Sequence, residues 1–84
     1  MKLSIYSLKK ILFQGEAKEV NCKTSNGEIT ILDNHRSLIS TLKKGVIKVI
    51  DKNEKEHYTP VSSGFLEVGG NIAKFIVEEG NITD

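Results

Sequence analysis

The chain has 84 residues, of which 38% are hydrophobic and 27% charged, and its formal net charge is +1. This length predicts one domain, residues 1–84, and the balanced charge excludes the basic stripe typical of nucleic-acid binding proteins. The single cysteine, Cys22, excludes an internal disulfide, and the apolar runs are far shorter than the ~20 residues of a transmembrane helix. Lys9 and Lys10 interrupt the apolar N-terminus before a signal-peptide core can form, so we expect the protein to stay in the compartment where it is made.

In chain order, the first element is residues 7–15, "SLKKILFQG". Its apolar residues recur at helical spacing between Ser7, a candidate cap, and Gly15, a candidate stop. The same spacing returns in residues 35–45, "HRSLISTLKKG", which end at Gly45. For both segments, periodicity alone leaves helix and strand open.

The other segments have the pattern of strands. "EVNCKT" alternates, and Asn26-Gly27 after it is the strongest hairpin signal, because both residues tolerate the positive φ of a type I′ turn. The runs "EITIL", "GVIKVID", "HYTPVSSGFLEV" and "NIAKFIVEE" are rich in β-branched and aromatic residues. Further turn signals stand at Gln14-Gly15, Asp33-Asn34, Lys44-Gly45, Lys52-Asn53, Ser63-Gly64 and Gly69-Gly70-Asn71. Short strands separated by such turns predict a sandwich or a barrel.

Candidate chemistry gathers in one stretch, where Glu28, Asp33 and His35 lie within eight positions. As an acid–base or metal enzyme, the protein would need these groups buried or joined by further ligands. Glu28 follows a hairpin glycine and Asp33 stands in a turn, where side chains are normally in water. His57 lies in a charged hairpin segment, and Cys22 alternates with apolar strand residues. We therefore expect no catalytic residue, no metal site and no cofactor.

An ordered set of residues nevertheless runs through the chain. It comprises Phe13 and Gly15, Gly27 and Glu28, His35, Leu38 and Leu42, Gly45, and finally Ser63, Gly64, Glu67 and Val68. This order resembles the N-terminal domain of the ATP synthase epsilon subunit. The family pattern is a Phe-x-Gly, a Gly-Glu turn, a loop ending in His, a Leu-rich strand, a Gly that opens an apolar strand, and a Ser-Gly-Gly-type turn before Glu-Val.

The resemblance implies an all-β fold, a sandwich of two antiparallel sheets, with strands in both segments that periodicity left open. It also implies a non-catalytic rotor subunit that binds the gamma subunit, rests on the polar loops of the c-ring and rotates with both during proton-driven ATP synthesis. Such a subunit lies on the cytoplasmic side of an energy-transducing membrane, in a bacterium the cell membrane. It reaches that membrane only through the complex.

The resemblance also assigns partner-binding residues. Ser7 and His35 are expected to face gamma, and Glu28 to meet the c-ring loops. The expected partner-binding residues also include Arg36, Leu38 and Leu42.

Two departures from the family pattern stand out. Asp33-Asn34 replaces the common Pro-Gly before the His, so the path of this loop is expected to differ slightly. The chain also ends before the C-terminal helical hairpin that is usual in the family, so neither an inhibitory arm nor a nucleotide site is implied here.

One alternative function is left open, a small ligand- or carbohydrate-binding β-sandwich. Such modules present exposed aromatic side chains as stacking platforms. The chain has three Phe, two Tyr and no Trp. The polar residues at the C-terminus are expected to fray, and residues 81–83 match a glycosylation sequon that we set aside because nothing indicates secretion.

Overall fold

The computed structural model describes residues 1–80, which form seven β-strands and no helix. The strands are β1 (Lys2–Tyr6), β2 (Ile11–Thr24), β3 (Gly27–Ile31), β4 (His35–Leu42), β5 (Gly45–Asp51), β6 (Glu56–Gly70) and β7 (Ile72–Glu79). The predicted all-β fold is confirmed. Within the described part of the chain, no helix is long and apolar enough to cross a membrane. The sequon at 81–83 and most of the C-terminal residues expected to fray lie outside the described residues.

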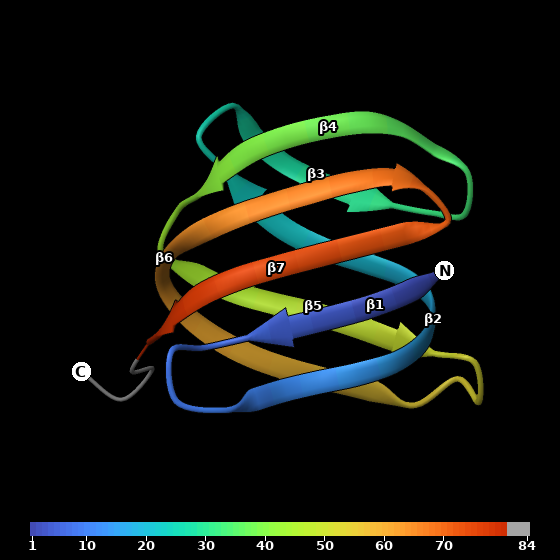
Figure 1. Ribbon diagram of the computed structural model, residues 1–84, viewed down its shortest axis with the longest axis horizontal. Helices are drawn as coiled ribbons and strands as arrows, with labels where there is room; N and C mark the ends of the chain where they lie inside the picture. The colour runs from blue at the N-terminus through green and yellow to red at the C-terminus, as the bar shows by residue number, and fades with distance from the viewer. Residues whose placement is uncertain (81–84) are drawn as a thin grey trace.

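The strands form two layers that are joined by two long, curved strands (Figure 1). The first part of β2 pairs with β1, and its second part pairs with β5 and β3. The first part of β6 pairs with β5, and its second part pairs with β4 and β7. One layer therefore holds β4, β6, β7, β1 and the start of β2, and the other holds β3, β2, β5 and the start of β6. The predicted antiparallel sandwich is confirmed, with one parallel pairing, between β1 and β7.

The core fills the space between the two layers. In β7 every second side chain enters it, so that Ala73, Phe75 and Val77 are buried and the residues between them are exposed. Cys22 is fully buried in β2, as its alternation with apolar residues predicted. Burial, with a smaller contribution from the charge of Glu28, raises the pKa of its thiol to about 11. A protonated, enclosed thiol is a packing residue and not a nucleophile.

Both segments that periodicity left open contain strands. β4 covers most of the second segment, and β2 begins inside the first one, at Ile11. Pairing with distant strands decides this outcome over local helical spacing. Ser7 caps a tight turn instead of a helix, because its Oγ accepts hydrogen bonds from the amides of Lys9 and Lys10, both at 3.2 Å. Gly15 stops no element, since it lies within β2.

The hairpin predicted at Asn26-Gly27 is present, but its geometry differs from the prediction. Thr24 already pairs with Gly27, so the two turn residues are Ser25 and Asn26. Of Asn26 and Gly27, only Gly27 has a positive φ, 117°, so the type I′ prediction is wrong. The Oγ of Thr24 accepts the amide of Asn26 at 3.1 Å and donates to the carbonyl of Gly27 at 2.8 Å. The threonine side chain thus closes the turn.

The turns predicted at Gln14-Gly15 and Ser63-Gly64 are wrong, because both pairs lie inside long strands. Gly64 is needed there for another reason. A Cβ at this position would lie 2.5 Å from the carbonyl oxygen of Ile76 and 2.9 Å from the Cα of Val77. Only a glycine lets the backbones of β6 and β7 approach so closely.

The β5–β6 hairpin contains a polar cluster of its own. One oxygen of Asp51 accepts the amides of Asn53 and Lys55 at 2.8 and 3.0 Å, and the other lies 2.8 Å from Nε2 of His57. The bond from His57, followed by those from the backbone amides, lowers the pKa of Asp51. The His57 ring also meets the ring of Phe13 edge-on, with centroids 5.1 Å apart. His57, which the sequence places in a charged hairpin segment, is thus bonded to Asp51 and packed against Phe13, with 41% of its side chain still exposed.

Candidate partner-docking surface

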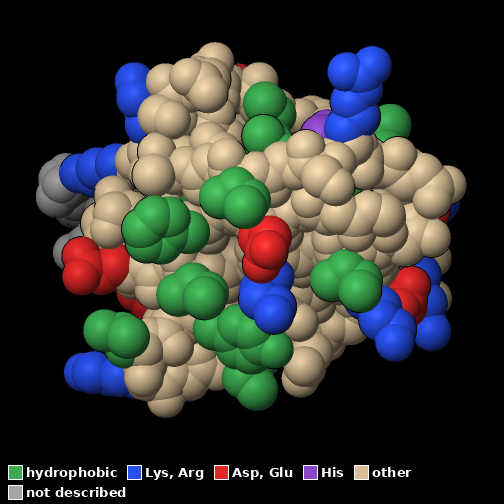
Figure 2. Space-filling model, turned by 45° about the horizontal axis from the view of Figure 1, so that its top comes forward, with side chains coloured by type: hydrophobic (Ala, Val, Ile, Leu, Met, Phe, Trp, Pro, Cys, Tyr) green, Lys and Arg blue, Asp and Glu red, His purple; other side chains and the backbone are tan. Residues whose placement is uncertain are grey.

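The layer formed by β4, β6, β7 and β1 leaves large hydrophobic side chains exposed on its outer side. Four of them, each at least half exposed, lie on neighbouring strands, and we call this group the apolar face: Ile39, Phe65, Ile72 and Ile76. Phe65 of β6 stands directly opposite Ile76 of β7 in the strand register, which brings the two side chains together. Figure 2 shows such hydrophobic side chains around one acidic and one basic side chain. Exposed apolar side chains on neighbouring strands make this side of the domain a candidate interaction site.

The apolar face has a charged pair at its centre. Glu67 of β6 pairs in register with Lys74 of β7 on one side and with Ile39 of β4 on the other. Both charged residues line two open hollows of the surface together with side chains of the apolar face. Opposite charges on neighbouring strands attract each other across the sheet. They also give this side of the layer one negative and one positive group beside its apolar side chains.

The outer side of the other layer is polar by comparison. Asn21 of β2 donates to the hydroxyl of Thr30 in β3 at 3.0 Å. The ammonium of Lys48 in β5 lies 3.8 Å from one carboxylate oxygen of Glu56, and the other oxygen accepts a hydrogen bond from the hydroxyl of Tyr58. That bond is the main reason why the pKa of Tyr58 is raised. Because these polar groups bond to one another, this side of the sandwich has less need of a partner.

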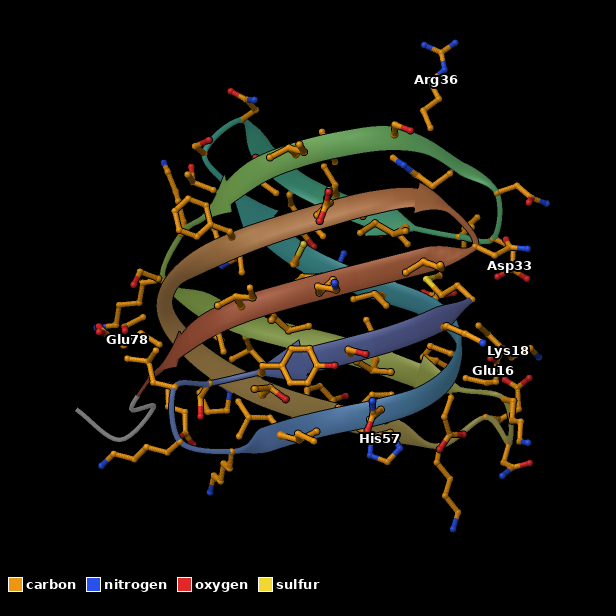
Figure 3. The ribbon with its side chains drawn as sticks, in the orientation of Figure 1. Glu16, Lys18, Asp33, Arg36, His57 and Glu78 are labelled. Carbon is orange, nitrogen blue, oxygen red and sulfur yellow. The ribbon has the colours of Figure 1, made fainter. Side chains whose placement is uncertain are left out.

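Ser7 and His35 lie at opposite ends of the apolar face. β1 runs parallel to β7, so the Ser7 loop follows the end of β7 and shares a hollow with Glu78. His35 pairs with Gly70, next to the start of β7. Figure 3 shows Glu78 at one end of the molecule and Asp33, which precedes the His35 strand, at the other. A partner lying along β7 would therefore meet both Ser7 and His35.

The loop before His35 is held by bonds to two distant segments. The amide of Asn34 donates to the side-chain oxygen of Asn71 at 2.9 Å, and Asp33 accepts a bond from the amine of Met1 at 2.6 Å. Asn34 has a φ of 62°, the conformation that a glycine would supply and that asparagine tolerates. Nδ1 of His35 lies 2.7 Å from the carbonyl oxygen of Arg36. Since a carbonyl only accepts, Nδ1 carries the proton and a neutral ring keeps Nε2 as its acceptor.

The stretch with Glu28, Asp33 and His35 does not form one site. Glu28 follows the β2–β3 hairpin, whereas Asp33 and His35 lie beyond the other end of β3, roughly five strand residues or 16 Å away. Among residues 1–80, no group of three or more His, Cys, Asp and Glu side chains is arranged to hold a metal ion. Glu28 is exposed at its hairpin, which leaves its carboxylate accessible.

The remaining predicted partner-binding residues differ in exposure. Arg36 extends away from the body of the molecule (Figure 3). Leu38 is partly buried against the core, and Leu42, at 6% exposure, belongs to it. The side chain of Leu42 therefore holds β4 from inside and offers no surface to a partner. On β4, the large hydrophobic residue that points outward is Ile39, next to Leu38.

The residues predicted from the sequence to bind a partner include none of the four side chains of the apolar face. A usable signal stands in β7, where Ile72 and Ile76 occupy one side of the strand and Ala73, Phe75 and Val77 occupy the other. The outer side of β7 thus carries two isoleucines among charged residues, and within residues 1–80 no second layer covers it. Isoleucines on the outer side of a strand in a two-layer fold are therefore a usable sequence signal for docking.

The exposed aromatic residues do not make a stacking platform. Phe65 lies on the apolar face, and Tyr58 lies on the outer side of the other layer. Phe75 is buried in the core, and Phe13 packs against His57. A sugar-binding platform needs aromatic rings side by side. Tyr6 of β1, the fifth aromatic residue, is separated from Phe65 by Ile76 of β7, which pairs with both.

Comparisons with known proteins agree on one family. The model of the family described as ATP synthase, Delta/Epsilon chain, beta-sandwich domain matches residues 1–81. The ATP synthase epsilon chain of Leptospira interrogans is 33% identical over 84 residues, which is all of this chain and 65% of the relative. That of Clostridium kluyveri is 35% identical over 78 residues, covering 93% of this chain and 59% of the relative. The chain thus spans about two thirds or less of the length of these relatives.

Solved structures show the same fold. A chain of the Euglena gracilis mitochondrial ATP synthase, solved as OSCP/F1/c-ring, superposes with a TM-score of 0.87 at 20% identity, covering 94% of this chain and 51% of that one. A chain of the Tetrahymena thermophila mitochondrial ATP synthase central stalk/c-ring gives a TM-score of 0.79 at 15% identity, covering 94% and 63%. At these identities the likeness concerns the fold.

Proposed function

The chain belongs to the ATP synthase delta/epsilon chain β-sandwich family, and from this premise we propose that it is a non-catalytic rotor subunit of an F-type ATP synthase. In this proposal it lies in the central stalk and couples the gamma subunit to the membrane c-ring during proton-driven ATP synthesis. The observation that carries the proposal is the apolar face on β4, β6 and β7. An F-type rotor subunit has to hold its partner through many rotations, and this face is the surface suited to that task.

The apolar face can supply most of the free energy of binding to gamma. Full burial of a large aliphatic or aromatic side chain is worth about 1.5–3 kcal/mol. With its four side chains between 50% and 76% exposed, complete covering yields roughly 4–7 kcal/mol before the costs of association. An exposed ion pair adds only about 0–1 kcal/mol. Gamma is therefore expected to bind through this face, with Glu67 and Lys74 fixing its position.

Ser7 and His35 are proposed to contact gamma at the two ends of the same surface. Ser7 already bonds to its own loop, so it contributes the shape of the turn more than a free hydroxyl. His35 offers Nε2 as an acceptor for a donor on gamma. Arg36 projects into solvent (Figure 3) and adds a charge at the rim.

Glu28 is proposed to meet the polar loops of the c-ring. It lies at an exposed hairpin, where a carboxylate can accept hydrogen bonds from a polar loop without disturbing the core. This contact places the protein against the cytoplasmic side of the bacterial cell membrane, held there through the complex. No cofactor is required, because the subunit transmits torque and performs no chemistry.

Calorimetric titration of this chain with recombinant gamma subunit tests the proposal. Phe65→Ala is expected to weaken binding about tenfold or more, and Tyr58→Ala is the matched control, since the two side chains are 60% and 59% exposed on opposite sides of the sandwich. His35→Ala and Ser7→Ala are expected to weaken binding to a smaller degree. If folded gamma does not bind, or if Tyr58→Ala weakens binding as much as Phe65→Ala, the proposal is wrong.

A crosslink tests the position of Glu28 in the assembled complex. Glu28→Cys is expected to form a disulfide with a cysteine placed in the c-ring polar loop, and Glu56→Cys on another hairpin is expected to form none. The native Cys22 is enclosed in the core and does not compete.

A further inference from the structure

Three pairs of residues on β6 and β7 form three neighbouring rows on the outer side of the layer that carries the apolar face. Successive pairs are two residues apart on both strands, and they are Phe65 with Ile76, Glu67 with Lys74, and Gly69 with Ile72. Paired residues point to the same side of a sheet, and so do alternate residues of one strand. All three rows therefore face the same way, toward whatever covers this layer.

The two members of each pair complement each other. Phe65 and Ile76 are both apolar, and each is at least half exposed. Glu67 and Lys74 carry opposite charges, and among the ion pairs of residues 1–80 none involves either of them. In the third pair, an isoleucine that is 57% exposed stands beside a residue without a side chain. Such a surface also complements a second copy of itself, provided that the copy exchanges the members of each pair.

One two-fold arrangement of two copies makes this exchange. When two sheets pack face to face with aligned strands, a two-fold axis in the interface runs either along the strands or across them. An axis along the strands, between β6 and β7, brings each residue against its register partner in the other copy. Glu67 then meets Lys74 of the second copy, and symmetry makes this contact twice. In the neighbouring rows apolar side chains meet, and each isoleucine of the third row packs over a glycine.

The charges disfavour the other two-fold arrangement. An axis across the strands, along the row of Glu67 and Lys74, would place each of these two side chains against the same side chain of the second copy. Like charges brought together at an interface repel each other. The register of β6 and β7 thus selects the axis along the strands.

The layer is large enough for a dimer, but only for a weak one. Figure 1 views the molecule down its shortest axis, and in this view it measures 34 by 27 Å. A face of this outline covers at most about 900 Å², compared with about 800 Å² per partner in a protein–protein interface of standard size. Nearly the whole layer would have to be covered to reach the standard area. We therefore expect association at high micromolar concentration.

We propose that the free chain forms a two-fold dimer through the apolar face, in which Glu67 of each copy pairs with Lys74 of the other. The dimer covers Phe65, Ile72 and Ile76 while no other partner is present. Its role rests on the proposed function, because the same face is assigned there to gamma. Gamma and the second copy exclude each other, so dissociation of the dimer precedes entry into the stalk.

Sedimentation equilibrium of the 84-residue chain, without gamma, tests the dimer. The mean mass is expected to rise from 9.3 kDa toward twice that value as the concentration is raised from about 10 µM to about 1 mM. Lys74→Glu should weaken association at least about tenfold, because it places a carboxylate against Glu67 in both contacts. Lys52→Glu makes the same change of charge on the exposed β5–β6 hairpin, and as the matched control it should change association less than about twofold.

A mixture of two variants separates charge pairing from damage to the fold. Glu67→Lys alone should weaken association about as much as Lys74→Glu. An equimolar mixture of the two should associate at least as tightly as the wild type, because one copy then carries two carboxylates and the other two ammonium groups. A wild-type chain that stays monomeric at about 1 mM would overturn the proposal. So would equal effects of Lys74→Glu and Lys52→Glu, or a mixture that associates no better than either variant alone.

Gamma enters in a second measurement. Added to the wild-type dimer, folded gamma is expected to form a complex with one copy of this chain, and a complex that retains the dimer would contradict mutual exclusion. If gamma does not bind, the rotor assignment fails while the dimer measured without gamma stands. If gamma binds a chain that is monomeric by itself, the dimer is overturned and the rotor assignment stands.

Discussion

Ile39 and Leu42 are three residues apart on β4. Substitutions at these two positions should distinguish an effect on binding to gamma from an effect on the stability of the fold. Ile39 is 76% exposed on the apolar face, and Leu42 is 6% exposed in the core. Full burial of an isoleucine side chain is worth about 1.5–3 kcal/mol, so about three quarters of that value remains to be gained when a partner covers Ile39. Ile39→Ala is therefore expected to weaken binding to gamma by about 1–2 kcal/mol, roughly 5- to 30-fold. Its effect on the free energy of unfolding should stay near 0.5 kcal/mol.

Leu42→Ala should have the opposite profile. Removing a buried leucine costs about 2–5 kcal/mol, from a total stability of roughly 4–13 kcal/mol for a domain of this size. Binding to gamma by the folded fraction should change little, because Leu42 does not reach the surface.

Two measurements on each variant check this reasoning. Urea unfolding followed by circular dichroism gives the free energy of unfolding, and calorimetric titration gives the affinity for gamma under conditions in which each variant is folded. Unfolding losses of similar size in both variants would contradict the assignment of inside and outside on β4. An Ile39→Ala variant with undiminished affinity would refute the apolar face as the gamma-binding surface.

Three further predictions concern the fold. Gly64→Ala should lower the free energy of unfolding in urea by about 1–3 kcal/mol, because the new Cβ would lie 2.5 Å from a backbone oxygen of β7. Gly69→Ala is the control, since its Cβ would lie 3.4 Å from its nearest neighbour, and it should cost less than about 1 kcal/mol. Cys22 should react with a thiol reagent only as fast as the protein unfolds, since burial raises its pKa to about 11; rapid labelling in native buffer would contradict its place in the core. The pKa of Asp51 is lowered in the folded state, so its contribution to stability is present at neutral pH and is lost as the pH falls below about 4 and through the lowered pKa. Asp51→Asn should therefore unfold at lower urea than the wild type at pH 7, with a smaller difference at low pH, and equal differences at both pH values would exclude this linkage.

Several parts of the structure follow from local sequence. The β2–β3 hairpin lies where Asn26-Gly27 places it, and Asn34 has the positive φ that its turn requires. Alternation in β7 separates Phe75 and its buried neighbours from the exposed residues between them. Local features of this kind depend on a few adjacent residues, and so they can be predicted without knowledge of the remaining chain.

Two sequence patterns were misleading for one physical reason. The helical spacing in β4 arises because the strand carries apolar residues on both sides, with Leu38 and Leu42 toward the core and Ile39 toward solvent. The turn signal at Ser63-Gly64 arises because β6 needs a glycine where β7 approaches its backbone. In each case the residue type answers to a neighbour that is distant in sequence, which periodicity within one segment cannot reveal.

By itself the sequence determined most of the strands and turns, the absence of an internal disulfide and the family pattern. Only the tertiary structure decided which apolar residues remain uncovered. β4, β6 and β7 bury one side against the second layer, and the pairing of β6 with both neighbours brings Ile39, Phe65 and Ile76 together on the other. The register of long-range strand pairs sets this outcome, because it decides which side of each strand faces the core and which side is left for a partner.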